Sequence, residues 1–206
     1  MQNDPFARAV LTRRIFGATL VGGAAMALVP GAARALDVDS ARALIDKAIG
    51  DVNNVINSGK AEAAMFGDFE KIFVKYADVP VIARSALGVA ARQASDGQMK
   101  AYTKAFQGYI SRKYGRRFRE FIGGKIEVTD ARPVKTYFEV ISVAHLQGES
   151  PFDLRWHVSN KSGRDLFFNI IIEGVNMLAS ERTEIGAMLD KRGGDIDALI
   201  GDLNSI

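Results

Sequence analysis

The chain has 206 residues, 48% of them hydrophobic, and a formal net charge of +3 at pH 7. It contains no cysteine, which excludes thiolate catalysis, thiolate metal sites, iron–sulfur clusters and disulfides. The first 35 residues hold four arginines and one aspartate, so the whole positive excess lies there. The remainder of the chain is balanced in charge and gives no support for a nucleic-acid-binding surface.

The first 35 residues have the pattern of an export signal. Arginines form a basic head, a Gly/Ala-rich apolar run follows, and Ala33-Arg34-Ala35 is a small-x-small cleavage signature. The apolar run is shorter than the roughly 20 residues that span a membrane. Arg13-Arg14-Ile15-Phe16 resembles a twin-arginine signal, and an ordinary secretory signal is the alternative. We therefore predict a periplasmic protein whose mature part, 36–206, is a single domain with room for two lobes.

Two amphipathic helices are predicted at the start of this domain. The first covers 39–57, with an apolar stripe at helical spacing and Asp39 or Ser40 as its N-cap. The second covers 62–77 and carries several aromatic side chains along one side, which favours a place in the core.

A short helix and a long one are predicted next. Asp78 caps the short helix, Pro80 lies in its first turn and Gly88 ends it. The long helix covers 96–122, with an aromatic side and a basic side. The basic side is either a solvated surface or a patch that docks a partner or faces a lipid headgroup. Its cations are Lys100, Lys104, Arg112, Lys113, Arg116, Arg117 and Arg119.

Four strands are predicted at 125–130, 135–147, 152–158 and 166–172. The first and third alternate apolar and polar side chains, and the second presents two interleaved sets of side chains to its two faces. Short turns separate successive strands, which indicates an antiparallel meander. The fourth strand is apolar on both faces, so each face must be covered. Helices can cover one face, and the other requires more protein or an apolar ligand.

Two further helices are predicted at 180–192, with Ser180 as its cap, and at 195–204. Helices followed by strands and then by helices indicate an α+β fold. We therefore expect a curved four-stranded antiparallel sheet covered by the N- and C-terminal helices.

The sequence contains few of the residue patterns that are typical of catalytic sites. His145 and His157 lie on successive strands, but two imidazoles without a third ligand do not predict a metal site. No H-E-x-x-H pattern, phosphate-cradling glycine loop or glycine-flanked nucleophilic serine occurs in the chain. We predict no catalytic residue, no metal, no cofactor and no enzymatic activity.

One set of motifs lies between residue 39 and the C-terminus: Leu87-Gly88, the aromatic spacing of Tyr102, Phe106, Tyr109 and Tyr114, the run Ile172-Glu173-Gly174-Val175-Asn176-Met177, and Arg182. Together these motifs resemble the MlaC family of periplasmic phospholipid-binding proteins. Asn169 and Asn176 stand where that family pattern has an aspartate and a serine.

The resemblance implies a soluble carrier with an apolar cavity between the sheet and the helices. Acyl chains of a phospholipid occupy the cavity and the headgroup lies near the surface. Such a carrier moves lipid between an outer-membrane lipoprotein complex and an inner-membrane ABC transporter with its substrate-channel subunit. The phospholipid is then a ligand, and the carrier needs no nucleotide of its own.

On this basis we expect a set of apolar side chains to line the cavity, and Gly174 to allow close approach of the backbone. Arg182 either meets a lipid phosphate or pairs with Glu173, and we favour the pair. The expected lining residues are Val79, Ile82, Leu87, Tyr102, Phe106, Tyr109, Phe138, Val140, Trp156, Ile171, Gly174, Val175 and Met177.

Two alternatives remain open at this point. One is a small cone-shaped enzyme of the isomerase or dehydratase kind, which needs a buried acid or base such as Asp153 or His157. Strand alternation places both side chains opposite Trp156, which disfavours this alternative. The other is a binding adaptor that takes no lipid and has a solid core.

Overall fold

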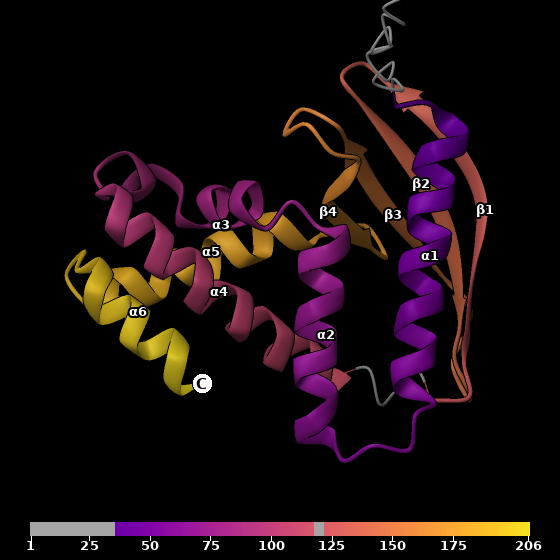
Figure 1. The fold of residues 1–206 in the computed structure, drawn as a ribbon, viewed down its shortest axis with the longest axis horizontal. Coiled ribbons are helices and arrows are strands. Elements are labelled where there is room, and N and C mark those ends of the chain that lie inside the picture. Colours follow the sequence, from indigo (N-terminus) through magenta and orange to yellow (C-terminus); the bar gives the residue numbers. More distant parts are fainter. Residues whose placement is uncertain (1–35, 118–121) are drawn as a thin grey trace, which may run out of the picture. The chain divides into compact units, whose positions relative to one another are not determined.

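The computed structural model describes residues 36–117 and 122–206. The predicted export signal and residues 118–121 lie outside this described part. The division into a signal, 1–35, and a single domain, 36–206, stays a prediction. The described residues belong to one compact unit. They form six α-helices, one short 3-10 helix and five strands. Figure 1 shows how the helices lie against the sheet. The prediction of an α+β fold is confirmed.

The first helix, α1, covers Val38–Ile56, and its N-cap is Asp37 rather than the predicted Asp39 or Ser40. The Asp37 carboxylate accepts from the Ser40 N–H at 2.7 Å, and the Ser40 hydroxyl accepts from the Asp37 N–H at 2.9 Å. Ser40, one of the two predicted caps, is therefore the N3 residue of a capping box whose N-cap is Asp37. The next helix, α2, covers Glu62–Tyr76, close to its predicted limits.

Asp78 caps the short helix α3, Val79–Leu87, as predicted, and Gly88 with φ +66° ends it. The 3-10 helix η1, Gly88–Arg92, leads to the long helix α4, Asp96–Arg117. Near the C-terminus, α5 covers Met177–Lys191 and α6 covers Ile196–Ser205.

The α5 helix starts three residues before the predicted cap. Asn176 is its N-cap, and its side chain accepts from the Ala179 N–H at 3.1 Å. Ser180 lies inside the helix, where its hydroxyl donates to the Asn176 carbonyl at 3.2 Å. Both residues are competent caps, and the chain uses Asn176, which is also the last residue of a short strand.

The strands form one antiparallel meander in the order β1-β2-β3-β4-β5. They are β1, Lys125–Val134; β2, Tyr137–His145; β3, Phe152–Ser159; β4, Leu166–Ile172; and β5, Val175–Asn176. The first strand continues past its predicted end to a tight turn in which Lys135 has φ +45°. The two-residue β5 was not predicted, because two residues are too few for a periodic signal.

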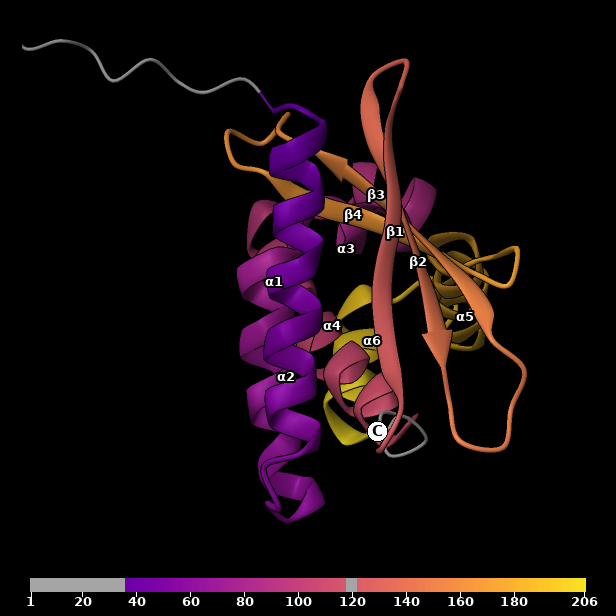
Figure 2. The same cartoon turned by 90° about the vertical axis from the view of Figure 1, so that its right-hand side faces the viewer.

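The sheet has an inner face, which packs on the helices, and an outer face. The inner face of β2 and β3 carries Val140 paired with Trp156, and Phe138 paired with Val158. Helix α1 runs along β1 and β2, and α3 and α5 contact β4, as Figures 1 and 2 show. One continuous apolar cluster joins this inner face to α1, α3, α4, α5 and α6.

Gly88 is a backbone position where only glycine fits without strain. Its φ is +66°, and a Cβ atom built there lies 3.3 Å from Arg182 Nε. Gly88→Ala is therefore expected to lower the free energy of unfolding by about 1–2 kcal/mol. Gly186→Ala, inside α5 with open space around the added Cβ, is the matched control. It should raise that free energy by about 0.5–1 kcal/mol in urea unfolding. Equal effects of the two changes would contradict the expectation.

Candidate functional site

Most of the expected lining residues lie in the apolar cluster between the sheet and the helices. Two are half-buried on the inner face of the sheet, Phe138 and Trp156, and pack against the buried cluster. Seven have exposed fractions of 8% or less: Val79, Ile82, Leu87, Tyr102, Phe106, Tyr109 and Val140. The structure thus brings nine of the expected residues together in one region.

Helix α4 presents three aromatic side chains to this interior. Tyr102 and Phe106 are fully buried, and Tyr109 is 2% exposed. Their rings follow one another along the helix, with centroids 5.8 Å apart for Tyr102 and Phe106 and 6.3 Å apart for Phe106 and Tyr109. The spacing i, i+4, i+7 places all three on one side of the helix. They form the helical wall of the interior.

Trp156 belongs to the opposite wall, on β3. Its ring meets Phe167 edge-on, with centroids 5.3 Å apart, and its Nε1–H donates to the buried Ser142 hydroxyl at 2.9 Å. An indole N–H turned away from water usually finds such a partner. The hydrogen bond holds the indole plane in place and leaves an apolar surface toward the helices.

Four of the expected lining residues lie elsewhere. Val175 is 54% exposed and Gly174 is exposed, because both belong to the short β4–β5 hairpin at the edge of the sheet. Met177 is half-buried at the start of α5. Ile171 pairs with Arg155 on the outer face, so the expectation that it faces the interior is wrong.

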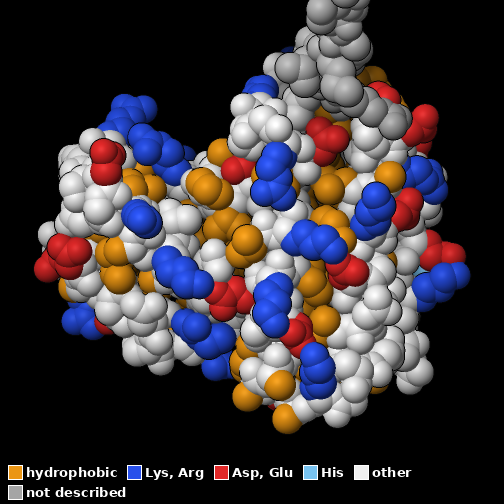
Figure 3. Space-filling model, in the orientation of Figure 1, with side chains coloured by type: hydrophobic (Ala, Val, Ile, Leu, Met, Phe, Trp, Pro, Cys, Tyr) orange, Lys and Arg blue, Asp and Glu red, His pale blue; other side chains and the backbone are white. Residues whose placement is uncertain are grey.

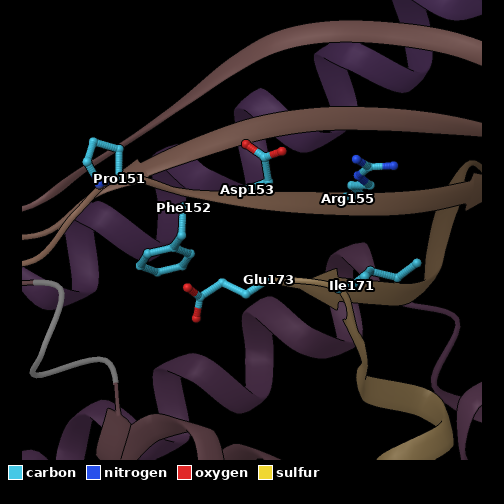
Figure 4. Close-up of a pocket in the computed structure, with 7 residues that line it drawn as sticks. Pro151, Phe152, Asp153, Arg155, Ile171 and Glu173 are labelled. Atoms are coloured by element: carbon cyan, nitrogen blue, oxygen red, sulfur yellow. The ribbon is translucent and has the colours of Figure 1, made fainter.

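Ile171 and Gly174 line a surface pocket of about 580 Å³ with Pro151, Phe152, Asp153, Arg155 and Glu173. In Figure 4 the Phe152 ring and the Glu173 carboxylate point toward each other, whereas Asp153 points to the opposite side of β3. The wall of this pocket mixes charged and apolar side chains. It is therefore different in character from the apolar interior.

Glu173 and Arg182 do not form the expected ion pair in the described part of the chain. Glu173 has φ +49° in the tight β4–β5 turn, and its N–H donates to the Asp153 carbonyl at 3.1 Å. Arg182 is exposed and lies beside Gly88 instead. Glu173 is held by the β4–β5 turn and Arg182 by α5, so the two side chains have different neighbours.

The basic side of α4 is largely tied to neighbouring elements. Lys104 pairs with Glu70 of α2 at 2.8 Å, and Arg112 donates to the Leu203 carbonyl at the end of α6. Figure 3 shows basic and acidic side chains interspersed on the face that carries α2 and α4. Most of these cations therefore join helices and do not form a continuous docking patch, whereas Arg119 lies outside the described residues.

A polar cluster between α4 and α5 was not predicted. The Tyr109 hydroxyl donates to Glu184 at 2.6 Å, and Lys113 Nζ donates to Glu181 at 2.7 Å and also to Glu184. The Tyr114 hydroxyl donates to Glu181 as well. Burial raises the pKa of Tyr109 and Tyr114, and their hydrogen bonds to the carboxylates raise it further.

His157 lies on the outer face of the sheet, away from the apolar interior. Its ring is 4.5 Å from that of Tyr137 and 5.7 Å from that of Phe168, between centroids. Its Nε2 is 3.7 Å from the Glu139 carboxylate, which also binds Arg132. Burial lowers the pKa of His157 from 6.5, and Glu139 opposes part of that shift.

This environment predicts a pH dependence of stability. In the unfolded chain the imidazole takes up a proton below about pH 6.5, whereas the folded protein resists protonation until a lower pH. The contribution of His157 is therefore fully present above pH 6.5 and is lost as the pH falls through the folded-state pKa. Urea unfolding between about pH 5 and pH 7.5 should show a shallower decline for His157→Gln than for the wild type.

If the decline in stability is as steep in His157→Gln as in the wild type, the burial of His157 is not its source.

The described residues contain no group of three His, Cys, Asp or Glu side chains that is placed to hold a metal ion. The two histidines do not face each other, since His157 pairs with Glu139 and His145 pairs with Lys125. None of the described helices is long and apolar enough to cross a membrane.

The model of the MlaC protein family matches residues 44–205. A crystal structure of a phospholipid-binding protein from Ralstonia solanacearum, in complex with a phospholipid, has a similar fold, with a TM-score of 0.69 and 22% sequence identity. The match covers 80% of this chain and 95% of the other.

Proposed function

The chain belongs to the MlaC family, and on that premise we propose that it binds a phospholipid with the acyl chains between the sheet and the helices. The observation that supports this most directly is the continuous apolar cluster. It joins the aromatic side of α4 to the inner face of β2 and β3. The Ralstonia protein of similar fold carries a phospholipid.

The free energy of transferring a lipid from water into this region is large and favourable. Each methylene that leaves water contributes about 0.8 kcal/mol, so the roughly 30 methylenes of a diacyl lipid contribute on the order of 20 kcal/mol or more. A bilayer offers nearly the same environment. Exchange between membrane and carrier is then close to balanced and requires no nucleotide bound to the carrier.

The proposal extends to a role in transport. A protein exported by its N-terminal signal would act in the periplasm and carry lipid between an outer-membrane complex and an inner-membrane ABC transporter. This arrangement serves the lipid asymmetry of the outer membrane. It is supported by the export pattern in residues 1–35 and by membership of the family.

An enzymatic function has less support. The candidate base His157 lies on the outer face of β3, opposite Trp156, and Asp153 is exposed. Neither side chain faces the apolar interior, where a substrate would be protected from water. A binding protein therefore fits the placement of the polar groups better than an isomerase or dehydratase does.

The test is native mass spectrometry of the full chain expressed with its signal and purified from the periplasm. We expect a fraction of the protein to carry one phospholipid, and delipidated protein to take lipid from vesicles. Protein that is consistently empty and takes up no lipid from vesicles would overturn the proposal.

A further inference from the structure

The connection from α3 to α4 carries positive charge without acidic neighbours in the chain. Residues 79–95 include Arg84 and Arg92 but no aspartate or glutamate, and the next acidic residue, Asp96, starts α4. Both arginines are exposed, as is Arg182, which reaches this connection from α5. Figure 3 shows basic side chains gathered at the upper left, over the end of the molecule where α3 leads into α4. The three arginines are called the arginine surface below.

Two of these guanidinium groups lie on the same side of α3. A Cβ built on Gly88 is 3.3 Å from Arg182 Nε and 3.5 Å from Arg182 Nη2. Arg84 lies one helical turn before Gly88, whose N–H donates to the Arg84 carbonyl, so both positions share one side of the helix. Arg182 therefore lies against the side of α3 from which Arg84 projects.

The arginine surface has no counter-ion in the part of the chain that the structure describes. None of its three members forms an ion pair with a carboxylate there. Cations of α4 behave differently, since Lys104 pairs with Glu70 and Lys113 pairs with Glu181. Like charges held close together repel each other, and an external anion would relieve that repulsion.

Exposed valines accompany the arginines. Val81 is 42% exposed and Val89 is 65% exposed. Val81 and Arg84 are three residues apart, which makes them neighbours on the surface of α3. Val89 and Arg92 have the same separation in η1, and side chains three apart in a 3-10 helix are eclipsed. Each apolar side chain thus stands beside a cation, as in segments that lie in the interface of a membrane.

The opposite side of α3 belongs to the apolar interior. Val79, Ile82 and Leu87 are buried in the cluster between the sheet and the helices. The same short helix therefore has one side in the region proposed for the acyl chains and the other side open to solvent. A bilayer that meets the open side would lie one helix away from that region.

We infer that the arginine surface docks on a bilayer that contains anionic phospholipids. The guanidinium groups bind lipid phosphates, whose geometry they match, and Val89 enters the boundary between headgroups and acyl chains. An acidic protein is the other kind of partner, but residues 79–95 contain no aromatic residue of the kind that anchors specific protein interfaces. The inference goes beyond the proposed function, because it concerns the surface that meets the membrane and not the interior that holds the lipid.

The test is co-sedimentation of the protein, expressed with its signal and purified from the periplasm, with two kinds of vesicle. One kind is phosphatidylcholine alone, and the other is equal parts phosphatidylcholine and phosphatidylglycerol. Each arginine near an anionic bilayer strengthens binding about fivefold, so we expect binding on the order of a hundredfold tighter to the anionic vesicles. High salt should release the protein, because the Debye length falls to about 3 Å at 1 M.

Replacing all three arginines of the surface with glutamine should remove most of this preference. The matched control also replaces three exposed cations with glutamine, on α1, α2 and α4, so the net charge falls by the same amount. It combines Lys47→Gln, Lys71→Gln and Lys104→Gln. The control should keep the preference to within a few fold, because its cations lie away from the arginine surface.

Val89→Trp reports directly on contact with the bilayer. Indole rings favour the membrane interface, so the variant should bind the anionic vesicles at least as tightly as the wild type. The emission of the added indole should move to shorter wavelength with the anionic vesicles and stay unchanged with phosphatidylcholine alone. Trp156 is the chain's own tryptophan, and subtracting the wild-type spectrum removes its contribution.

The outcomes separate this inference from the proposed function. Equal loss of binding in the two triple variants would mean that net charge attracts the protein, and it overturns the docking surface. A wild type that binds neither vesicle also overturns it, which is the result expected if the partner is an acidic protein. Native mass spectrometry of the same preparations tests the proposed function independently, because lipid carried by the protein is counted without vesicles.

Discussion

Replacing Phe106 with alanine is expected to lower the free energy of unfolding by about 3–5 kcal/mol. Phe106 is fully buried and its ring lies between those of Tyr102 and Tyr109 on α4. Loss of the ring removes apolar contacts and leaves a cavity that a packed helix cannot close. Urea unfolding of delipidated protein, followed by circular dichroism, measures the change.

The control for this change is Val89→Ala, since Val89 is 65% exposed on η1. Its effect should stay within about 0.5 kcal/mol of the wild type. If Phe106→Ala costs no more than Val89→Ala, the aromatic side of α4 does not support the core.

Replacing Val140 with tryptophan is expected to reduce lipid occupancy about tenfold or more. Val140 is fully buried on the inner face of β2, paired with Trp156. Under the proposed function, an indole added there would compete with the acyl chains for the same space. Overpacking of a filled core costs about 1–3 kcal/mol, and we expect the bound lipid to leave to relieve that strain. Native mass spectrometry and a melting curve of each variant measure the two effects.

Val175→Trp is the matched control, because Val175 is 54% exposed in β5. The same indole there should leave both the lipid occupancy and the melting temperature near those of the wild type. A Val140→Trp protein that melts at a lower temperature yet retains its full lipid occupancy would show that the acyl chains lie elsewhere.

The local elements of this fold follow from local patterns. Asp78 and Pro80 define the start of α3, and Gly88 its end, because caps and breakers act within one helical turn. The alternation in β3 identified the face that carries Trp156, and this face pairs with Val140 of β2. The observed N-caps, Asp37 and Asn176, lie a few residues before the predicted ones. In both places the chain offers more than one side chain that can cap a helix.

The candidate site was predictable only in part. The aromatic spacing of α4 pointed to Tyr102, Phe106 and Tyr109, which lie together in the interior. Glu181 escaped sequence reasoning, because it is one charged residue among many on an amphipathic helix. Its partners Lys113 and Tyr114 lie 68 and 67 positions away in the chain. No periodic signal connects residues at that separation.

The sequence by itself determined the order of helices and strands, the α+β class and the membership of the MlaC family, because these depend on periodicity, turn chemistry and motifs carried by neighbouring residues. Only the tertiary structure decided that Val175 is exposed, that Arg182 lies beside Gly88, and that Glu181 binds Lys113 and Tyr114. Those outcomes depend on how α4, α5 and the edge of the sheet pack, and packing brings together side chains whose spacing along the chain carries no record of the contact.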